Sequence, residues 1–167
     1  GIKIEMLKTL SGNHKQCEVT FENVRVGKED IVGELHRGWD VIGNVLKMGA
    51  MMLCAEMVGA GQRVLEMMVD YAKTRIQFEM PIGIHNWVQE YCIMAFADVQ
   101  GTRNLVYEAA WMLSTGIPCD LEVAMAKARA NEACVDAHWQ AHQVLAGVGF
   151  TTQDGVLPLH TRRGKVC

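Results

Sequence analysis

Apolar residues from Trp39 onward recur at steps of three and four, the spacing of one face of an α-helix. The pattern predicts a first helix from Trp39 to about Thr74. Its apolar face consists of Val58, Gly61, Leu65, Met68 and Ala72. Its interior also contains Gly43, Gly49, Gly59 and Gly61. Each glycine weakens a helix by roughly 1 kcal/mol relative to alanine, so we expect close helix packing or a ligand nearby to compensate.

The same periodicity continues beyond the turn at residues 75–84. It predicts a second helix over about 85–115, stopped by Gly116 and Pro118. A third helix is expected to run to Leu145, with Asp120 as its N-cap. Its small residues predict a central position in the fold: Ala124, Ala126, Ala130, Ala133, Ala137 and Ala141. A fourth helix is expected to start near Val156.

Residues 1–26 instead alternate apolar and polar positions, as strands do. "GKED" at 27–30 is typical of a turn. The predicted fold is therefore mainly α, with an up-down four-helix bundle over 35–167. Residues 1–34 are expected to form two or three strands from the end of a truncated β-domain, followed by a linker into the bundle. Because the chain opens in a strand pattern and stops in a helical one, we expect a fragment whose bundle is incomplete at its carboxyl end.

Composition narrows the classes of function. The 167 residues are 50% hydrophobic, which suits one domain or one domain with part of another. A net charge of −3 and a pI near 6.1 argue against nucleic-acid binding. No apolar stretch is expected to span a membrane. The six cysteines are scattered without a CxxC pair, which favours a reducing compartment such as the cytoplasm or the mitochondrial matrix.

Metal binding and general acid–base chemistry have weak support. His138 and His142 are four residues apart on one predicted helix face, a spacing that can bind zinc. The metalloprotease motif needs a glutamate directly after the first histidine, and here Trp139 follows it. We therefore predict no metal site. The carboxylates on the predicted helices are expected on solvated faces: Glu56, Glu66, Glu90 and Glu132.

Two corners between the predicted helices carry unusual residues. "YAKTRIQFEMPIG" at 71–83 places Arg75, Gln77 and Phe78 just before a proline that ends helical continuity. "GVGF" at 147–150 follows a helix rather than a strand, so it is not a dinucleotide fingerprint. It fits a helix C-cap, although backbone amides at such a turn can also hold phosphate oxygens.

These two corners, in this order, resemble motifs of the acyl-CoA dehydrogenase family. The family carries "YAxxRxQFGxPIxxFQxxQ" where this chain has "YAKTRIQFEMPIGIHNWVQ", and "HQxxGGxGF" where it has "HQVLAGVGF". Between them, "AAWMLSTG" and "AMAKARANEA" resemble "AAxxxDxG" and "AxAKxxAsE". "VTFENVRVGKEDIVGELHRGW" resembles the end of the family's middle β-domain and the linker into its helical bundle. The resemblance covers essentially the whole chain.

The resemblance implies an FAD-dependent dehydrogenase. In this family a glutamate removes the α-proton of an acyl-CoA, the β-hydride passes to the flavin, and electrons leave to an electron-transfer flavoprotein. It also implies a homo-oligomer, a dimer or a dimer of dimers, with the flavin shared across a subunit interface. Arg75 and Phe78 would contact the FAD of a neighbouring subunit. The other residues at matching cofactor positions are Asn86, Gln143, Ala146, Gly147 and Gly149.

Several positions depart from the family pattern. Glu79 stands where the family has glycine, and beside phosphates its carboxylate would be repulsive unless it points away. Histidine and asparagine replace the "FQ" pair, and Ala146 replaces the first glycine of "GG". Lys47 and Ala50 replace the aspartate and arginine of a family "DxxR" motif.

The catalytic base is not identified. One branch of the family carries it at the position of Gly49, and the other carries it in a segment that would lie beyond Cys167. The chain alone is therefore expected to be inactive. Two alternatives stay open: a catalytically degenerate family member that acts as a structural partner in a hetero-oligomer, and a helical interaction module without cofactor.

Overall fold

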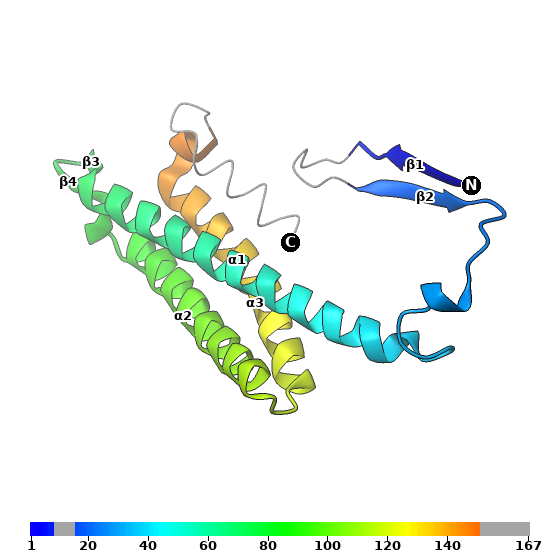
Figure 1. Ribbon diagram of the computed structural model, residues 1–167. Helices are drawn as coiled ribbons and strands as arrows, with labels where there is room; N and C mark the ends of the chain where they lie inside the picture. The colour runs from blue at the N-terminus through cyan, green and yellow to red at the C-terminus, as the bar shows by residue number, and fades with distance from the viewer. Residues whose placement is uncertain (9–15, 151–167) are drawn as a thin grey trace. The chain divides into compact units, whose positions relative to one another are not determined.

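The computed structural model describes residues 1–8 and 16–150 (Figure 1). The chain divides into two compact units, Gly1–Leu46 and Lys47–Cys167. The division falls inside the first helix rather than in a linker. The domain boundary expected at residues 34–35 stays a prediction, and so does the fourth helix near Val156, which lies outside the described residues.

The first unit contains a two-stranded antiparallel sheet. Strand β1 (Ile2–Met6) pairs with β2 (Cys17–Phe21), and the register places Ile2 opposite Phe21. The alternating pattern therefore predicted two strands correctly. Strand structure ends at Phe21 rather than at residue 26, and Asn23 takes a positive φ of 49° soon after it, which breaks the extended backbone. The expected turn at 27–30 contains a short 3₁₀ helix, η1 (Lys28–Asp30).

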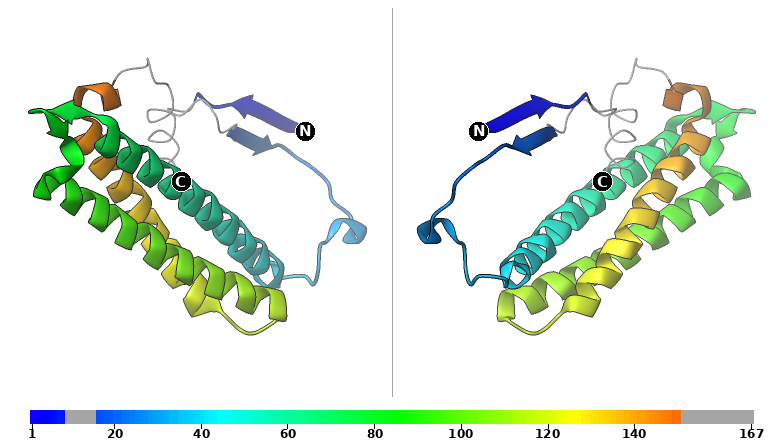
Figure 2. Two further views of the ribbon diagram at one scale, coloured as in Figure 1. Left: turned by 90° about the vertical axis from the view of Figure 1, so that its left-hand side faces the viewer. Right: turned by 90° about the vertical axis from the view of Figure 1, so that its right-hand side faces the viewer.

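Three long helices follow: α1 (Gly38–Thr74), α2 (Asn86–Thr115) and α3 (Asp120–Leu145). From residue 47 onward, α1 lies beside α2 and α3 in both views of Figure 2. The periodicity predicted these bounds to within one residue. Gly116, with a φ of 74°, caps α2 in the left-handed conformation that favours glycine.

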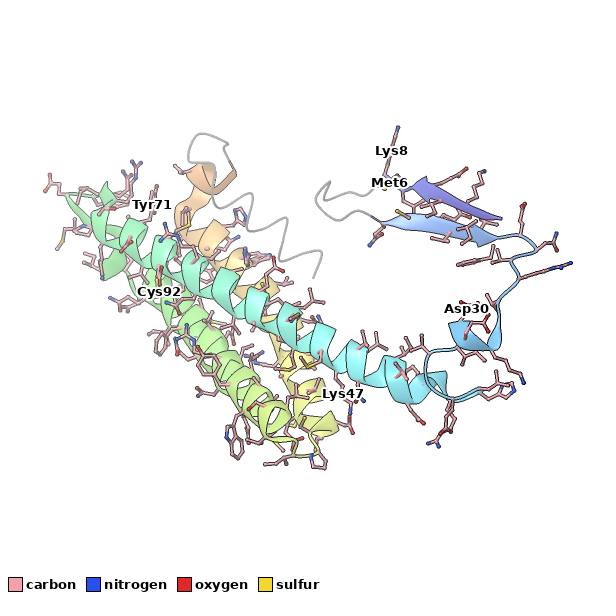
Figure 3. The ribbon with its side chains drawn as sticks, viewed as in Figure 1. Met6, Lys8, Asp30, Lys47, Tyr71 and Cys92 are labelled. Carbon is pink, nitrogen blue, oxygen red and sulfur yellow. The ribbon has the colours of Figure 1, made fainter. Side chains whose placement is uncertain are left out.

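The N-cap expected for the third helix was wrong. Cys119 occupies the cap position and provides no side-chain hydrogen bond, and Asp120 is the first helical residue. The Asp120 carboxylate instead pairs with Lys47 of α1, which Figure 3 labels. This hydrogen bond raises the pKa of Lys47. Asp120 thus links two helices and also places a negative charge in the first turn of α3, where the helix dipole favours it.

The predicted apolar faces form the core. All five residues expected on the face of α1 are buried, and Met68 is completely inaccessible. One cluster packs the carboxyl half of α1 against α2 and α3, and it includes Val64, Met68, Val88, Val99, Ala137, Ala141 and Val144. A second cluster lies at the other end of the three helices and includes Met51, Cys54, Met57, Val106, Ala126 and Ala130. Full burial of one such large side chain contributes about 1.5–3 kcal/mol.

The small residues of α3 have the expected effect on packing. The backbones of α2 and α3 approach more closely than any other helix pair in the described residues. Ala126, Ala130 and Ala137 are fully buried, whereas Ala124 is exposed and takes no part in this packing. Three residues per heptad suffice for a buried face, and Ala124 lies outside that stripe.

The interior glycines of α1 do not share one explanation. A Cβ added to Gly61 would lie 3.1 Å from Val99 Cγ2, so this glycine permits the close contact with α2 that we expected. Gly49 and Gly59 face open space, so helix packing does not explain them, and the expected alternative of a nearby ligand stays a prediction there. Among the described residues, the helix interior therefore needs glycine at position 61 alone for its packing against a neighbouring helix.

Side-chain hydrogen bonds fix the helices relative to one another. Arg103 of α2 donates to Gln62 Oε1 of α1 over 2.7 Å. Arg129 of α3 forms an ion pair with Asp98 of α2. Asp98 is only partly exposed, so solvent screens this pair less than a surface pair. These contacts set the register of α1 and of α3 against α2.

One expectation about apolar stretches needs correction. By length and composition alone, α1 could cross a membrane, so a long enough apolar stretch does exist in the described residues. From Met51 onward, however, its apolar face packs against α2 and α3. Three cysteines also behave as small core residues, because Cys54 of α1, Cys119 and Cys134 are buried. Burial raises the pKa of the Cys54 thiol.

Candidate functional site

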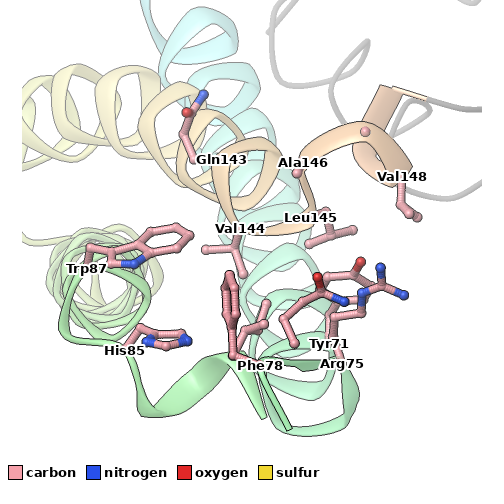
Figure 4. A pocket seen from close by; sticks show the side chains of 13 residues that line it. Tyr71, Arg75, Phe78, His85, Trp87, Gln143, Val144, Leu145, Ala146 and Val148 are labelled. Carbon is pink, nitrogen blue, oxygen red and sulfur yellow. The ribbon is translucent and has the colours of Figure 1, made fainter. Parts of the chain in front are cut away.

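The two corners singled out in the sequence meet in one pocket of about 460 Å³ within the second unit (Figure 4). Its walls come from the end of α1, the segment that joins α1 to α2, the start of α2 and the end of α3. The lining includes Tyr71, Arg75, Gln77, Phe78, Ile82, His85, Trp87, Gln143, Val144, Leu145, Ala146, Gly147 and Val148. The volume suits a cofactor-sized group.

The first corner is a small β-hairpin. Strand β3 (Ile76–Gln77) pairs with β4 (Met80–Pro81), and a 3₁₀ turn, η2 (Ile82–Ile84), leads into α2. The helix therefore ends at Thr74, and the sequence did not predict the hairpin after it. The Ile82 N–H donates to the Arg75 carbonyl over 2.9 Å, which closes the base of the hairpin.

The two-residue loop of this hairpin is strained. Phe78 and Glu79 have φ values of 53° and 69°. Two-residue hairpin loops of this kind need positive φ at both positions and therefore favour glycine and asparagine. A side chain in this left-handed region costs about 1–2 kcal/mol per residue. The loop holds the Phe78 ring with 88% of its surface exposed, beside the pocket that it lines.

Among the described residues that line the pocket, Arg75 supplies the only formal charge at neutral pH, counting histidine as neutral. It follows directly on α1, and its N–H donates to the Tyr71 carbonyl over 2.9 Å. In Figure 4 its guanidinium lies near Tyr71, on one side of Phe78. A guanidinium offers a planar fork of donors that matches phosphate oxygens.

The second corner begins where α3 ends. Ala146 takes a φ of 49° and its N–H donates to the His142 carbonyl, and the 3₁₀ helix η3 (Ala146–Phe150) continues from it. Gly149 is buried: an added Cβ would lie 3.0 Å from His142 Nδ1 and 3.3 Å from Leu145 Cβ. Gly147 faces open space beside the pocket. Only the second glycine is therefore required by packing.

The helix ends at the pocket have opposite electrostatic effects. The carboxyl end of α3 disfavours an anion, whereas the amino end of α2 favours one because its first backbone N–H groups are not used inside the helix. His85 and Trp87 line the pocket on either side of Asn86, the first residue of α2. The start of α2 and the Arg75 guanidinium thus make the anion-favouring parts of the wall.

Aromatic rings occupy the other side of the pocket. The Phe78 and His85 rings meet edge to face, with centroids 6.4 Å apart and planes at 87°. His85 and Trp87 are nearly parallel at 13°, again with centroids 6.4 Å apart. Tyr91 meets Trp87 edge to face on the next turn of α2. The pocket therefore has an aromatic end and a cationic end, which Figure 4 shows on opposite sides of Phe78.

Most of the predicted cofactor positions reach this pocket. Arg75, Phe78, Gln143, Ala146 and Gly147 line it. The two that do not are Asn86, which is exposed at the start of α2, and Gly149, which supports the turn from behind. Sequence reasoning missed Trp87 and treated His85 only as a departure from the family. Their aromatic spacing around Asn86 was the available signal.

Over residues 1–8 and 16–150, no carboxylate lines the pocket. Glu56, Glu66, Glu90 and Glu132 are all exposed, as predicted. Gln62 donates to Glu66 Oε1 over 2.9 Å, and this hydrogen bond, with Arg63 nearby, lowers the pKa of Glu66. None of these four residues meets the requirement for a general base beside a bound substrate. The described residues thus provide no candidate base in the pocket.

The histidine pair on α3 has a packing role. His138 is buried, and its Nδ1 lies 2.5 Å from the Cys134 carbonyl oxygen. His142 is half-buried beside Gly149. No group of three or more histidine, cysteine, aspartate or glutamate side chains could hold a metal ion in the part of the chain that the structure describes.

Comparison with known proteins identifies the family. A family model described as "Acyl-CoA dehydrogenase, C-terminal domain" matches residues 36–166. An acyl-CoA dehydrogenase of Bacillus subtilis is 32% identical over 133 residues, which are 80% of this chain and 35% of the relative. The chain thus spans about a third of the length of the curated relatives that it matches.

Solved structures share the fold. The glutaryl-coenzyme A dehydrogenase in complex with glutaryl-CoA superimposes with a TM-score of 0.90 at 29% identity, over 99% of this chain and 42% of that one. PigA with FAD and proline superimposes with a TM-score of 0.93 at 23% identity, over 99% of this chain and 43% of that one. The chain belongs to the acyl-CoA dehydrogenase family and contains its carboxyl-terminal helical domain.

Proposed function

We propose that this chain is part of an FAD-dependent acyl-CoA dehydrogenase that oxidises an acyl-CoA thioester between its α and β carbons. The observation that carries the proposal is the single pocket in which both family motifs meet, with its one guanidinium and its aromatic wall. Family membership supports the reaction class. The glutaryl-CoA bound to one relative supports a thioester substrate, and the FAD bound to PigA supports the cofactor.

The pocket fits one half of a dinucleotide cofactor. Arg75 would bind the diphosphate with its planar fork of donors. Phe78 would pack against the nucleoside, and Gln143 with the backbone at Ala146 and Gly147 would complete the wall. FAD, when bound, supplies the acceptor for the substrate hydride. The residues of this chain provide its position, its orientation and the exclusion of water.

The pocket also supports a shared site. Phe78 projects from the strained hairpin with almost all of its surface uncovered, and the pocket is open beside it. Burial of such a ring against a second subunit would recover about 1.5–3 kcal/mol. We therefore propose a homo-oligomer, a dimer or a dimer of dimers, in which Arg75 and Phe78 contact the FAD of the neighbouring subunit. An electron-transfer flavoprotein is the proposed acceptor of the electrons.

The catalytic base lies elsewhere in this proposal. Gly49 has no side chain to accept a proton, and the Lys47 ammonium is paired with Asp120. The base would therefore come from outside the described residues, and these residues alone would not turn over substrate. With Lys47 and Ala50 at the positions of the family "DxxR" motif, α1 offers neither the acid nor the arginine of that motif.

The same departures favour a second candidate, a catalytically degenerate subunit that keeps the fold and acts as a structural partner in a hetero-oligomer. Flavin spectroscopy of the full-length protein separates the two. The enzyme predicts the visible absorbance of oxidised flavin, which is bleached on addition of an acyl-CoA because the substrate reduces the flavin. Bound flavin that no acyl-CoA bleaches, across short, branched and aromatic acyl groups, would support the degenerate subunit. Colourless protein that takes up no added FAD would contradict both.

A further inference from the structure

Two aromatic residues at the start of α2 line the pocket, and neither is specified by the family motif: His85 departs from it and Trp87 stands at a position it leaves open. The family phrase has phenylalanine at the position of His85 and no fixed residue at that of Trp87. This chain places an imidazole and an indole there, and both line the pocket. They belong to this chain rather than to the shared motif, so they are candidates for its own ligand contacts.

The two rings stand at an unusual separation. Their planes differ by 13° and their centroids are 6.4 Å apart. Atoms in contact lie about 3.5–4 Å apart, so a flat ring held between two others needs about 7 Å. In Figure 4 the Trp87 ring lies above the His85 ring, both at the aromatic end of the pocket. A small rotation of either side chain would let a planar group enter between them.

The surroundings hold the two rings in place. The His85 N–H donates to the Ile82 carbonyl, and the His85 carbonyl accepts hydrogen bonds from the N–H groups of Val88 and Gln89. Tyr91 meets the Trp87 ring edge to face, and Phe78 meets the His85 ring edge to face. Trp87 nevertheless keeps 55% of its surface exposed. The backbone that carries the pair is thus fixed, and a large apolar area of Trp87 is left for a ligand to cover.

We propose that His85 and Trp87 form a clamp for the flat base of a nucleotide whose phosphates lie at Arg75. The inference rests on the proposed function and names the residues that hold the purine ring of its cofactor. Stacking suits this task because a purine offers a π-face on each side. The order of the wall, with aromatic rings on one side of Phe78 and the guanidinium on the other, sets the direction in which the nucleotide lies.

The test uses full-length protein freed of bound nucleotide, with FAD, ADP and inorganic diphosphate as probes in calorimetric titrations. Trp87→Ala removes the indole, and Trp111→Ala is the matched control because Trp111 is exposed on the same helix and does not line the pocket. Loss of one stacking partner is expected to weaken FAD and ADP binding by roughly 10- to 100-fold. Binding of inorganic diphosphate, which has no base, is expected to stay unchanged. Trp87→Phe keeps a ring and is expected to recover most of the ADP affinity.

The outcomes separate this clamp from the proposed function. If Trp87→Ala binds ADP as tightly as Trp111→Ala does, the clamp is wrong and the cofactor site stands. If Trp87→Ala weakens diphosphate as much as ADP, the indole supports the structure and does not hold a base, which also overturns the clamp. If the unchanged protein binds neither FAD nor ADP, the proposed function fails and the clamp fails with it.

Discussion

The strained hairpin beside the pocket predicts that glycine at position 79 makes the hairpin more stable, because of the backbone conformation at that position. Glu79 sits in the left-handed region with a φ of 69°, where a side chain costs about 1–2 kcal/mol relative to glycine. Glycine has a more flexible unfolded chain, which offsets about 0.4–1 kcal/mol of that gain. The variant Glu79→Gly is therefore expected to stabilise the closed hairpin by about 0.5–1 kcal/mol.

Hydrogen exchange at the Ile82 amide measures this local stability. That N–H donates to the Arg75 carbonyl at the base of the hairpin and is exposed to exchange only when the hairpin opens. Because 1.4 kcal/mol corresponds to a factor of ten, the gain predicts exchange slower by about 2- to 5-fold. A local measurement is preferred because the expected gain is confined to the opening of the hairpin.

The matched control is the same substitution in a helix. Glu90 is exposed on α2, where glycine instead costs about 0.5–1 kcal/mol. Glu90→Gly is therefore expected to speed exchange of the amides in its own helical turn. Equal effects of the two substitutions, or faster exchange at Ile82 in Glu79→Gly, would refute the claim that this loop is strained.

Two further predictions concern the core and the exposed face of α1. Met68→Ala empties a completely buried site between the helices and is expected to lower the unfolding free energy by about 2–5 kcal/mol. Met52→Ala, at a site 71% exposed, is expected to change the unfolding free energy by less than about 0.5 kcal/mol. Urea denaturation followed by circular dichroism compares the two variants. Gln62→Ala is expected to raise the pKa of Glu66 toward its ordinary value of 4.5, because the amide hydrogen bond is the main cause of the lowered pKa. A carboxylate whose pKa is lowered by folding stabilises the fold above its unfolded pKa and loses that contribution as pH falls. The stability of the Gln62→Ala variant should therefore fall less with acid below pH 4.5 than that of the unchanged protein. Carboxyl NMR titrations of both proteins measure the pKa of Glu66 directly.

The helices were predictable because their burial pattern is local. A face that repeats every three or four residues can be read without knowing its partner, and α1, α2 and α3 follow it closely. The N-cap of α3 was not predictable in the same way. Asp120 has the usual chemistry of a cap, but its pairing with Lys47 depends on a helix about seventy residues away in sequence.

The pocket was only partly predictable for a similar reason. Arg75 and Gln143 were found through motif resemblance, whereas Trp87 has meaning only once the rings of His85 and Phe78 stand beside it. The β3–β4 hairpin escaped prediction because strands of two residues show no alternation. Its loop also lacks the glycine or asparagine that signals such a turn.

The central claim is that Arg75 holds the diphosphate of a flavin dinucleotide. Flavin content of purified full-length protein, expressed as moles of FAD per subunit, tests it most directly. Arg75→Ala is compared with Arg63→Ala, which removes an exposed arginine of α1 that does not line the pocket. The account predicts that Arg75→Ala loses most of its flavin and that Arg63→Ala keeps it. Full flavin content in Arg75→Ala would contradict the assignment.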